Sequence, residues 1–304
     1  MRSNHCKKDL QALIIVVLFV FFTIPLVESA ELKQETIRAW NDYVQKTEQR
    51  IAQEVASSNR FLIMDYQDKD EVKHELDSLL SGDVVVDEMK GQNNGLSLRI
   101  PGGKIHHWRG AVYIPGIDLD FVLKRIQNPN SSDLSQEDVL ESRILERFPE
   151  GMKLFLKLQR SKIVTVVYNT EHNIHYTRYS DKRASSKSIA TKIAEVEQLE
   201  DKKEREKPQG EDHGFLWRLN SYWRYWQFRD GVIIECESLT LSRSIPRILD
   251  YMISPLIKRV ARESMERTLI STRARMLLHT EKPFQIEHLS EADISDQTQK
   301  DPSL

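Results

Sequence analysis

The chain has 304 residues, of which 39% are hydrophobic and 30% are charged, and its formal net charge is −2. This length accommodates one large domain or two small ones, and the composition is that of an ordinary globular protein. A net charge so near zero provides no overall positive field, so we expect no nucleic-acid partner.

The first thirty residues have the layout of a secretory signal peptide. Three lysine or arginine residues occur among the first eight, residues 12–22 form an unbroken apolar run, and Ser29 and Ala30 are small. This order of basic, apolar and small residues is typical of export signals. The run is short for a membrane-spanning helix, which needs about twenty apolar residues. We predict a signal peptide over 1–30, with a retained N-terminal anchor as the alternative, and export to the periplasm or cell envelope.

The next segment predicts helix. Apolar residues from Ile37 to Val55 recur at steps of three and four residues, with one step of seven, which is the spacing of one helix face. We expect a helix over 31–58 and a second short helical piece over 76–80. Together they form an N-terminal helical segment, residues 31–82, packed on the main domain.

Strands dominate the middle of the chain. β-branched runs and alternating apolar residues predict strands over 82–89, 106–114, 152–159, 163–168 and 173–179, with strands beginning from Val139. A short amphipathic helix over 118–127 interrupts them. Residues 188–199 fit either a helix or a strand, and their place among strands favours a strand.

The last structured segment is a long helix. Residues 200–212 are charged and predict an exposed loop, and two strands follow it. Residues 246–278 then predict a helix with Pro246 in its first turn and a kink or break at Pro255. Residues 279–304 predict a flexible tail. Consecutive strands followed by one long helix indicate an α+β domain in which the helix packs on an antiparallel sheet.

The two strands before the long helix carry an unusual set of aromatic rings. Asp230-Gly231 is typical of a two-residue hairpin turn. With that turn, Tyr225 lies opposite Cys236 and Trp223 lies opposite Ser238. Large rings beside small residues leave room above the sheet, either for the final helix or for a ligand.

The other face of this hairpin carries a charged pair. The same register places Arg224 opposite Glu237. We expect the two to form a stabilising ion pair on the outer face of the sheet. The alternative is the reverse orientation, in which the pair is a polar anchor inside an apolar cavity.

Several stretches together resemble a known superfamily. They are residues 106–119, 164–180, 188–197, 213–226 and 230–246. They are similar to uncharacterised exported bacterial members of the START-like superfamily, which includes polyketide cyclases, plant pathogenesis-related lipid binders and coenzyme Q-binding proteins. The resemblance covers residues 35–278 and implies a helix-grip fold of the START/Bet v 1 type. In that fold a curved antiparallel sheet wraps around a long C-terminal helix and encloses a cavity, and the order of elements predicted above agrees with it.

The resemblance implies a START-like domain over 83–278 that binds a hydrophobic small molecule, such as a lipid, a quinone or a polyketide-like compound. Fold alone does not define function. We expect the ligand to lie between the sheet and the last helix. The residues expected to line the site are Trp108, Tyr113, Trp223, Tyr225, Ile234, Cys236, Ser238, Leu256 and Val260. A monomer with transient membrane contact is expected.

The sequence supports a catalytic site or a metal site less than it supports a binding site. His106 and His107 are adjacent in a strand and therefore point to opposite faces. An apolar strand raises the pKa of Cys236, which opposes a nucleophilic role. We predict no catalytic residue, no metal and no cofactor. The alternatives are a cyclase- or hydrolase-like enzyme that uses a buried carboxylate or histidine in the same cavity, and an envelope interaction protein without a ligand.

Overall fold

A computed structural model describes most of the chain between residues 32 and 278. The described ranges are 32–89, 98–129, 138–161, 165–198, 203–208, 210–244 and 247–278. The signal peptide predicted over 1–30 and the tail predicted over 279–304 lie outside these ranges. None of the helices within them combines the length and the hydrophobicity that crossing a bilayer requires.

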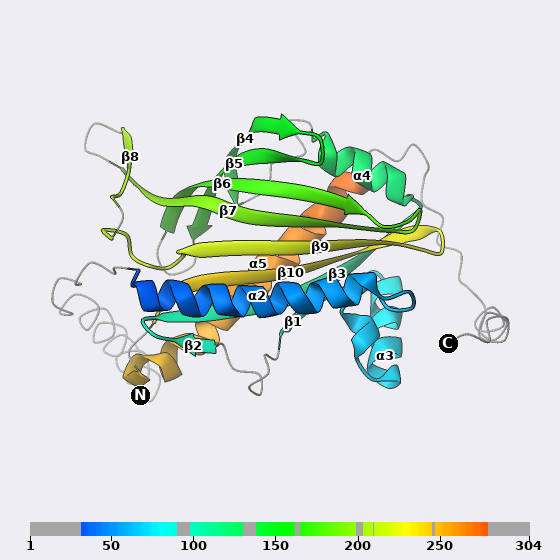
Figure 1. Cartoon of the computed structure of the whole chain (residues 1–304), viewed down its shortest axis with the longest axis horizontal. Helices are drawn as coiled ribbons and strands as arrows, with labels where there is room; N and C mark the ends of the chain where they lie inside the picture. The colour runs from blue at the N-terminus through cyan, green and yellow to red at the C-terminus, as the bar shows by residue number, and fades with distance from the viewer. Residues whose placement is uncertain are drawn as a thin grey trace, which may run out of the picture.

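The strands of the described ranges form one antiparallel sheet of ten strands (Figure 1). They are β1 (Val84–Glu88), β2 (Leu98–Ile100), β3 (Gly103–Pro115), β4 (Val139–Phe148), β5 (Gly151–Ser161), β6 (Thr165–Arg178), β7 (Arg183–Gln198), β8 (Glu204–Glu206), β9 (Arg218–Phe228) and β10 (Gly231–Arg243). Their spatial order is β1-β3-β10-β9-β7-β6-β5-β4, with β2 paired to β3 and β8 paired to β7.

Helices lie on both sides of this sheet. They are α2 (Gln34–Ala56), the short 3-10 helix η1 (Met64–Tyr66), α3 (Lys69–Leu80), α4 (Leu119–Gln127) and α5 (Arg247–Leu277). Figure 1 shows α2 in front of the sheet and α5 crossing behind it. We call the two sides of the sheet the α2 face and the α5 face. This arrangement of a large antiparallel sheet packed against a long C-terminal helix is the α+β, helix-grip architecture that the sequence predicted.

Side-chain caps mark where two of the helices begin. The carboxylate of Asp68 accepts hydrogen bonds from the backbone N–H groups of Asp70 and Glu71 at the start of α3. The carboxylate of Asp118 accepts one from Phe121 N at the start of α4. Each cap satisfies N–H groups that have no partner within the first turn, so these two helices begin at fixed positions.

Helix α5 approaches the sheet most closely at β3. A Cβ atom built on Gly110 would lie 2.7 Å from Leu269 and 2.9 Å from Met265, which leaves no room for a larger residue. Cys236 on β10 lies opposite Gly110 and is 2% exposed. The small residues Gly110 and Cys236 therefore make room for the helix at this point.

Most of the predicted elements agree with the structure, but the helix predicted over 76–80 is the last part of the longer α3, and β2 was not predicted. The helices predicted over 31–58, 118–127 and 246–278 are confirmed as α2, α4 and α5. The two strands predicted over 163–168 and 173–179 are one continuous strand, β6, because the polar residues between them alternate in and out of the sheet. The loop predicted over 200–212 contains the short strand β8.

The register predicted for the β9–β10 hairpin is wrong by two residues. Phe228 lies opposite Gly231, so the turn is Arg229-Asp230, and Arg229 adopts a positive φ of 52°. Gly231 is needed for another reason, because a Cβ there would lie 2.4 Å from the carbonyl oxygen of Ile114 on β3. A shift of two residues keeps every side chain on its predicted face of the sheet.

Candidate functional site

Most of the residues predicted to line a ligand site lie on the α5 face. They are Trp108, Trp223, Tyr225, Ile234, Cys236 and Ser238. Ile234 and Cys236 are almost fully buried in the core that includes Met265 and Leu269 of α5. The helix therefore fills the room beside the rings at this position, while Trp223 and Ser238 stay half-buried.

Three predicted site residues are placed differently. Tyr113 lies on the α2 face, where its hydroxyl donates a hydrogen bond of 2.7 Å to Asp230. Leu256 is 38% exposed, so it does not pack on the sheet as predicted. Val260 is half-buried and lies outside the line of α5 residues that packs on the sheet, namely Ala261, Met265, Leu269 and Met276.

A row of small side chains crosses the middle of the α5 face. Ser238, Ser221 and Ser188 are direct neighbours on β10, β9 and β7. Trp108 on β3 ends the row on one side, and Ile174 on β6 ends it on the other. The three serines are half-buried, although they occupy the centre of the sheet. We call these three residues the serine strip; α5 does not cover it completely.

The polar groups beside the serine strip are neutral. His172 Nε2 lies 2.9 Å from Thr170 Oγ1, and His172 Nδ1 lies 3.5 Å from Ser188 Oγ. Burial lowers the pKa of His172 to about 4, so its ring is uncharged at neutral pH. The hydroxyls of Ser186 and Tyr225 are 3.0 Å apart. The middle of the α5 face thus offers weak polarity without charge.

A hollow of about 500 Å³ lies beside α4, at one end of the α5 face. Leu123, Met152 and Tyr176, which line it, have side chains on the α5 face. Arg147 and Arg178 stand at its exposed rim. The hollow therefore opens on the same side of the sheet as the serine strip, although none of the three serines lines it.

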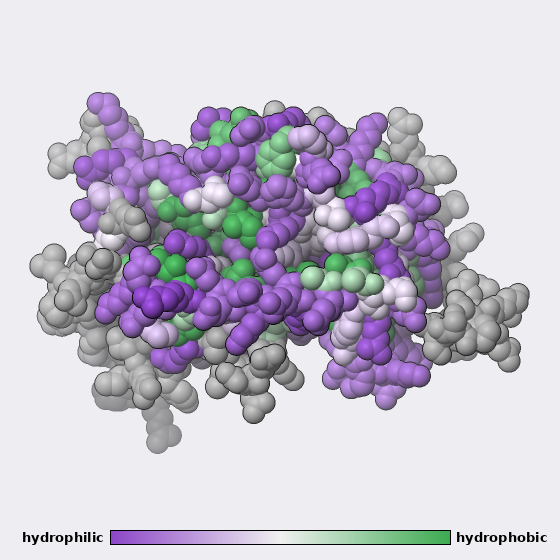
Figure 2. All heavy atoms as spheres, viewed as in Figure 1, coloured by the Kyte–Doolittle hydropathy of each residue, from purple (hydrophilic) through white to green (hydrophobic). Residues whose placement is uncertain are grey.

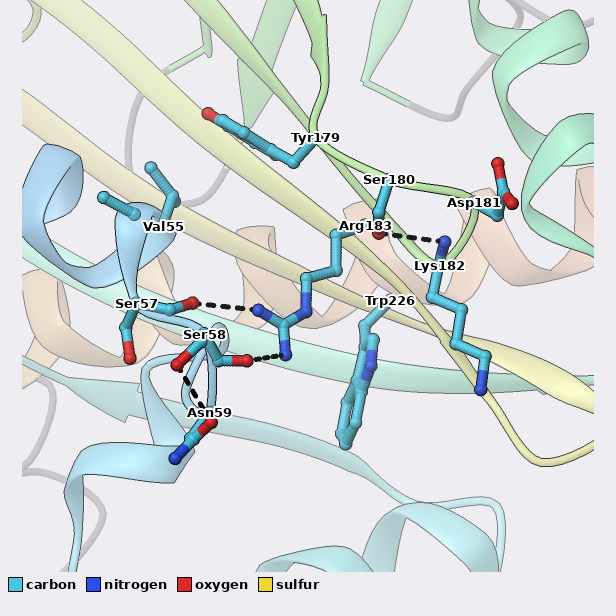
Figure 3. A pocket seen from close by; sticks show the side chains of 11 residues that line it. Val55, Ser57, Ser58, Asn59, Tyr179, Ser180, Asp181, Lys182, Arg183 and Trp226 are labelled. Atoms are coloured by element: carbon cyan, nitrogen blue, oxygen red, sulfur yellow. Dashed lines mark hydrogen bonds between the residues drawn. The ribbon is translucent and has the colours of Figure 1, made fainter. Parts of the chain in front are cut away.

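A second hollow, of about 940 Å³, lies on the opposite face at the end of α2 (Figure 3). Arg183 reaches across it and donates hydrogen bonds to the carbonyl oxygens of Ser57 at 2.9 Å and Ser58 at 2.6 Å. Trp226 and Lys182 also line this hollow. It is open, its lining combines polar side chains with the apolar surface of Val55 and Trp226, and it is separate from the cavity predicted between the sheet and α5.

The α2 face contains a network of ionisable side chains, most of them buried. Its members are Arg50 and Glu54 of α2, Glu75 of α3, His107 and Arg109 of β3, Arg224 of β9, and Glu235 and Glu237 of β10. We call this set the ion network. From this side the molecular surface is mostly hydrophilic, with hydrophobic residues gathered between α2 and the strands beyond it (Figure 2).

Arg224 is the centre of the ion network. It is 2% exposed, pairs with Glu54, and donates a hydrogen bond of 2.8 Å to the carbonyl oxygen of Phe61. Its nitrogens also lie 4.0 Å from Glu235 and 3.9 Å from Glu237. The predicted Arg224–Glu237 pair is therefore on the face away from α5, but it is buried beneath α2 and is not a surface pair.

The two glutamates of β10 have opposite pKa shifts. Burial raises the pKa of Glu235 to about 7, against the opposing charge of Arg224 and the backbone N–H of Ile63. Burial also acts on Glu237, but the hydrogen bond from His107 and the nearby arginines hold the pKa of this carboxyl below its ordinary value. Both carboxylates are 1% exposed and face away from the serine strip, so neither fits the predicted acid/base enzyme site.

Comparison with known proteins gives similarity to solved structures alone. No family model matches the chain, and no curated protein matches it. A STAR-related lipid transfer protein from Xanthomonas axonopodis is 18% identical, with 58% of this chain and 94% of that chain covered and a TM-score of 0.39. A START superfamily protein from Mycobacterium smegmatis is 11% identical over 57% and 99%, with a TM-score of 0.38. The Zhui aromatase/cyclase from a Streptomyces is 8% identical over 57% and 94%, with a TM-score of 0.37.

Proposed function

We propose that the protein binds a hydrophobic small molecule over the serine strip, between the sheet and α5. The observation that carries this proposal is a difference in burial along one face of the sheet. Ile234 is fully buried under α5, whereas Ser238, Ser221 and Ser188 are half-buried in the centre of the same face. A sheet centre that is both accessible and lined by small, uncharged side chains favours an apolar guest.

The energetics of such binding are ordinary. Burial of apolar surface contributes roughly 25 cal/mol per Å², so a ligand that covers about 200 Å² gains roughly 5 kcal/mol. Trp223 and Trp108 supply ring surface beside the strip, and the neutral His172 orients a polar group without a charge. We assign the access route from solvent to the hollow beside α4, because it opens on the same side of the sheet.

Binding is favoured over catalysis by the state of the reactive groups. The pKa of the Cys236 thiol is raised well above its ordinary value by burial, which opposes a nucleophilic thiolate. Glu235 lies on the opposite face beneath η1 and α2. The ligand class proposed is a lipid, a quinone or a polyketide-like compound, taken up by a monomer with transient membrane contact.

The N-terminal signal pattern supports export to the periplasm or cell envelope. N-terminal sequencing of the protein isolated from its source tests this part of the proposal. A mature chain that begins near Ala30 or Glu31 agrees with export, and an intact Met1 in the membrane fraction contradicts cleavage.

The site itself is tested by filling the serine strip. The change is Ser238→Phe, and the probe is Nile red, a neutral apolar dye whose fluorescence rises in apolar surroundings. The added ring occupies the space above the strip, so the dye should bind the wild type and lose at least about tenfold in affinity for the variant, which corresponds to roughly 1.4 kcal/mol.

The matched control is Ser185→Phe, at a half-buried serine on the α2 face of β7. This variant should bind the dye as the wild type does. Equal dye binding by Ser238→Phe and the wild type, with both proteins folded, would place the ligand elsewhere.

A further inference from the structure

Two arginines lie close together at the end of the α5 face that is remote from α4. Arg160 comes from β5 and Arg267 comes from α5. Both guanidinium groups contact the same oxygen, Asp138 Oδ2, at 3.1 Å and 3.0 Å respectively. One carboxylate therefore serves two cations, and the cluster has an excess of positive charge.

This positive charge is only partly hydrated. Burial lowers the pKa of Arg160, and the neighbouring Arg267 lowers it further, against the opposing effect of Asp138. The nearby buried carboxylate, Glu195, is already engaged, since it accepts a hydrogen bond of 2.6 Å from Lys207 and another from the backbone of His213. The excess charge is thus not neutralised by Glu195.

Two hydrogen-bond donors at the same end have no partner among the described residues. They are Arg267 Nε and the hydroxyl of Tyr168 on β6, and both atoms are buried. Tyr168 is 4% exposed, and the charged groups that act on its hydroxyl are the carboxylates of Glu195 and Asp212 and, less strongly, the guanidinium of Arg160. A buried donor without a hydrogen bond is costly, because the group has lost its hydrogen bonds to water without gaining a protein partner.

We propose that Arg160, Arg267 and Tyr168 form the site for the anionic headgroup of an amphiphile whose apolar chain lies over the serine strip. This proposal rests on the proposed function and adds to it the chemistry of the ligand. A carboxylate or a phosphate supplies negative charge for the two arginines and acceptor oxygens for Arg267 Nε and the hydroxyl of Tyr168. The shared chemistry is an anion joined to a long apolar chain.

The distances along the sheet suit such a ligand. Tyr168 and Ile174 are six residues apart on β6, which at roughly 3.3 Å per residue corresponds to about 20 Å. The chain would therefore run along β6 from the arginine cluster to Ile174 and turn there across the serine strip. The neutral His172 lies between the two, so the middle of this path holds no competing charge.

Two further cations, Arg178 and Arg147, stand at the rim of the hollow. Arg178 is paired with Asp120, which leaves Arg147. It is exposed and donates a hydrogen bond of 2.7 Å to the carbonyl oxygen of Gln127. Water already solvates this guanidinium, so it gains less from an anion than the partly buried Arg160 and Arg267 do. Charge recognition is therefore assigned to the arginine cluster, and Arg147→Gln serves as a second control.

The experiment measures binding of cis-parinaric acid, a fluorescent polyene fatty acid, and of the corresponding alcohol. The wild type should bind the acid at least about tenfold more tightly than the alcohol, because charge-assisted hydrogen bonds are worth more than neutral ones. Arg267→Gln should remove that preference and leave binding of the alcohol unchanged. Arg262→Gln, at an exposed residue of the same helix paired with Glu266, should behave as the wild type.

Further arms separate the sources of the anion. Hexadecyl phosphate and inorganic phosphate are added as competitors of cis-parinaric acid. Competition by the alkyl phosphate alone shows that the chain is required, whereas competition by inorganic phosphate at a similar concentration shows a free-anion site and overturns the amphiphile proposal.

A stability measurement without ligand distinguishes a binding site from a structural ion cluster. Arg267→Gln relieves repulsion with Arg160, so the melting temperature of the ligand-free variant should equal or exceed that of the wild type. A clearly lower melting temperature, equal affinity of the wild type for acid and alcohol, or loss of the preference in Arg147→Gln instead of Arg267→Gln, would each overturn the headgroup site. Failure of both the acid and the alcohol to bind the wild type would contradict the proposed function itself.

Discussion

The two faces of the sheet are built on opposite principles. The α2 face buries charge: Arg224, Glu235 and Glu237 are each at most 2% exposed, and α2 seals them in. The α5 face keeps its centre neutral and accessible, with the serine strip half-buried. Buried ion pairs add little net stability compared with apolar packing, but removing one partner is costly. The comparison indicates that the ion network fixes where the N-terminal helices dock, while the α5 face keeps the partly exposed centre that the proposed ligand site requires.

The largest effect is expected from breaking the ion network. Arg224→Ala removes the cation that faces Glu54, Glu235 and Glu237 and leaves these carboxylates without it in a dry site. The free energy of unfolding should fall by about 3–5 kcal/mol, measured by urea denaturation. The control Arg259→Ala removes an exposed pair with Glu263 on α5 and should change it by less than about 0.5 kcal/mol. Similar small losses in both variants would show that the network does not hold α2 on the sheet.

The next largest effect is expected where α5 grips the sheet. Leu269 is fully buried above Gly110, so Leu269→Ala should cost about 2–4 kcal/mol through lost burial and a cavity. Leu256 lies on the same helix but is exposed, so Leu256→Ala should cost less than about 0.5 kcal/mol. Thermal or urea unfolding of the two variants measures the difference. Equal losses would mean that the helix presents another face to the sheet.

The pH dependence of stability should have opposite signs for Glu235 on the α2 face and His172 on the α5 face. The folded protein holds the proton of Glu235 more tightly than the unfolded chain, because the pKa rises from 4.5 to about 7. Its contribution to stability is therefore complete below about pH 4.5 and is lost as the pH rises through 7. Relative to Glu235→Gln, the wild type should lose on the order of 3 kcal/mol between these pH values. A difference between the two proteins that stays constant with pH would refute the shift.

His172 on the α5 face should show a shift of similar size in the opposite direction. Its pKa falls from 6.5 to about 4 on folding, because burial disfavours the imidazolium. The contribution to stability is complete above about pH 6.5 and is lost as the pH falls through 4. Relative to His172→Asn, the wild type should lose on the order of 3 kcal/mol over this range. NMR titration of the His172 ring gives a direct check, and a midpoint near 6.5 would contradict its burial.

The sequence predicts the elements well because their signals are local. Apolar residues at helical spacing locate α2 and α5, and β-branched runs locate the strands. The prediction that Tyr113 lines the site beneath α5 was wrong for a physical reason. Strand β3 is buried on both sides along nearly its whole length, so the alternation of its residues does not indicate which side faces α5. The prediction that Leu256 packs on the sheet was wrong because the first part of α5 has apolar residues on more than one side.

The two faces also depend on contacts between distant parts of the chain. Arg224 pairs with Glu54, 170 positions away, and the sequence gives no sign that α2 covers this strand. Ser188 and Ser221 were missed as site residues because their adjacency depends on the register of β7 against β9, which are separated by a loop and β8. Contacts between distant strands and helices are decided by packing, and local sequence patterns do not predict them.

The most direct test of the central claim is native mass spectrometry of the protein isolated from its source without detergent. The proposed function predicts a fraction of the protein with the added mass of one small molecule, removed by organic extraction and absent from Ser238→Phe. Bare protein in every preparation, together with no binding of Nile red or cis-parinaric acid by the folded wild type, would contradict the account of the α5 face as a ligand site.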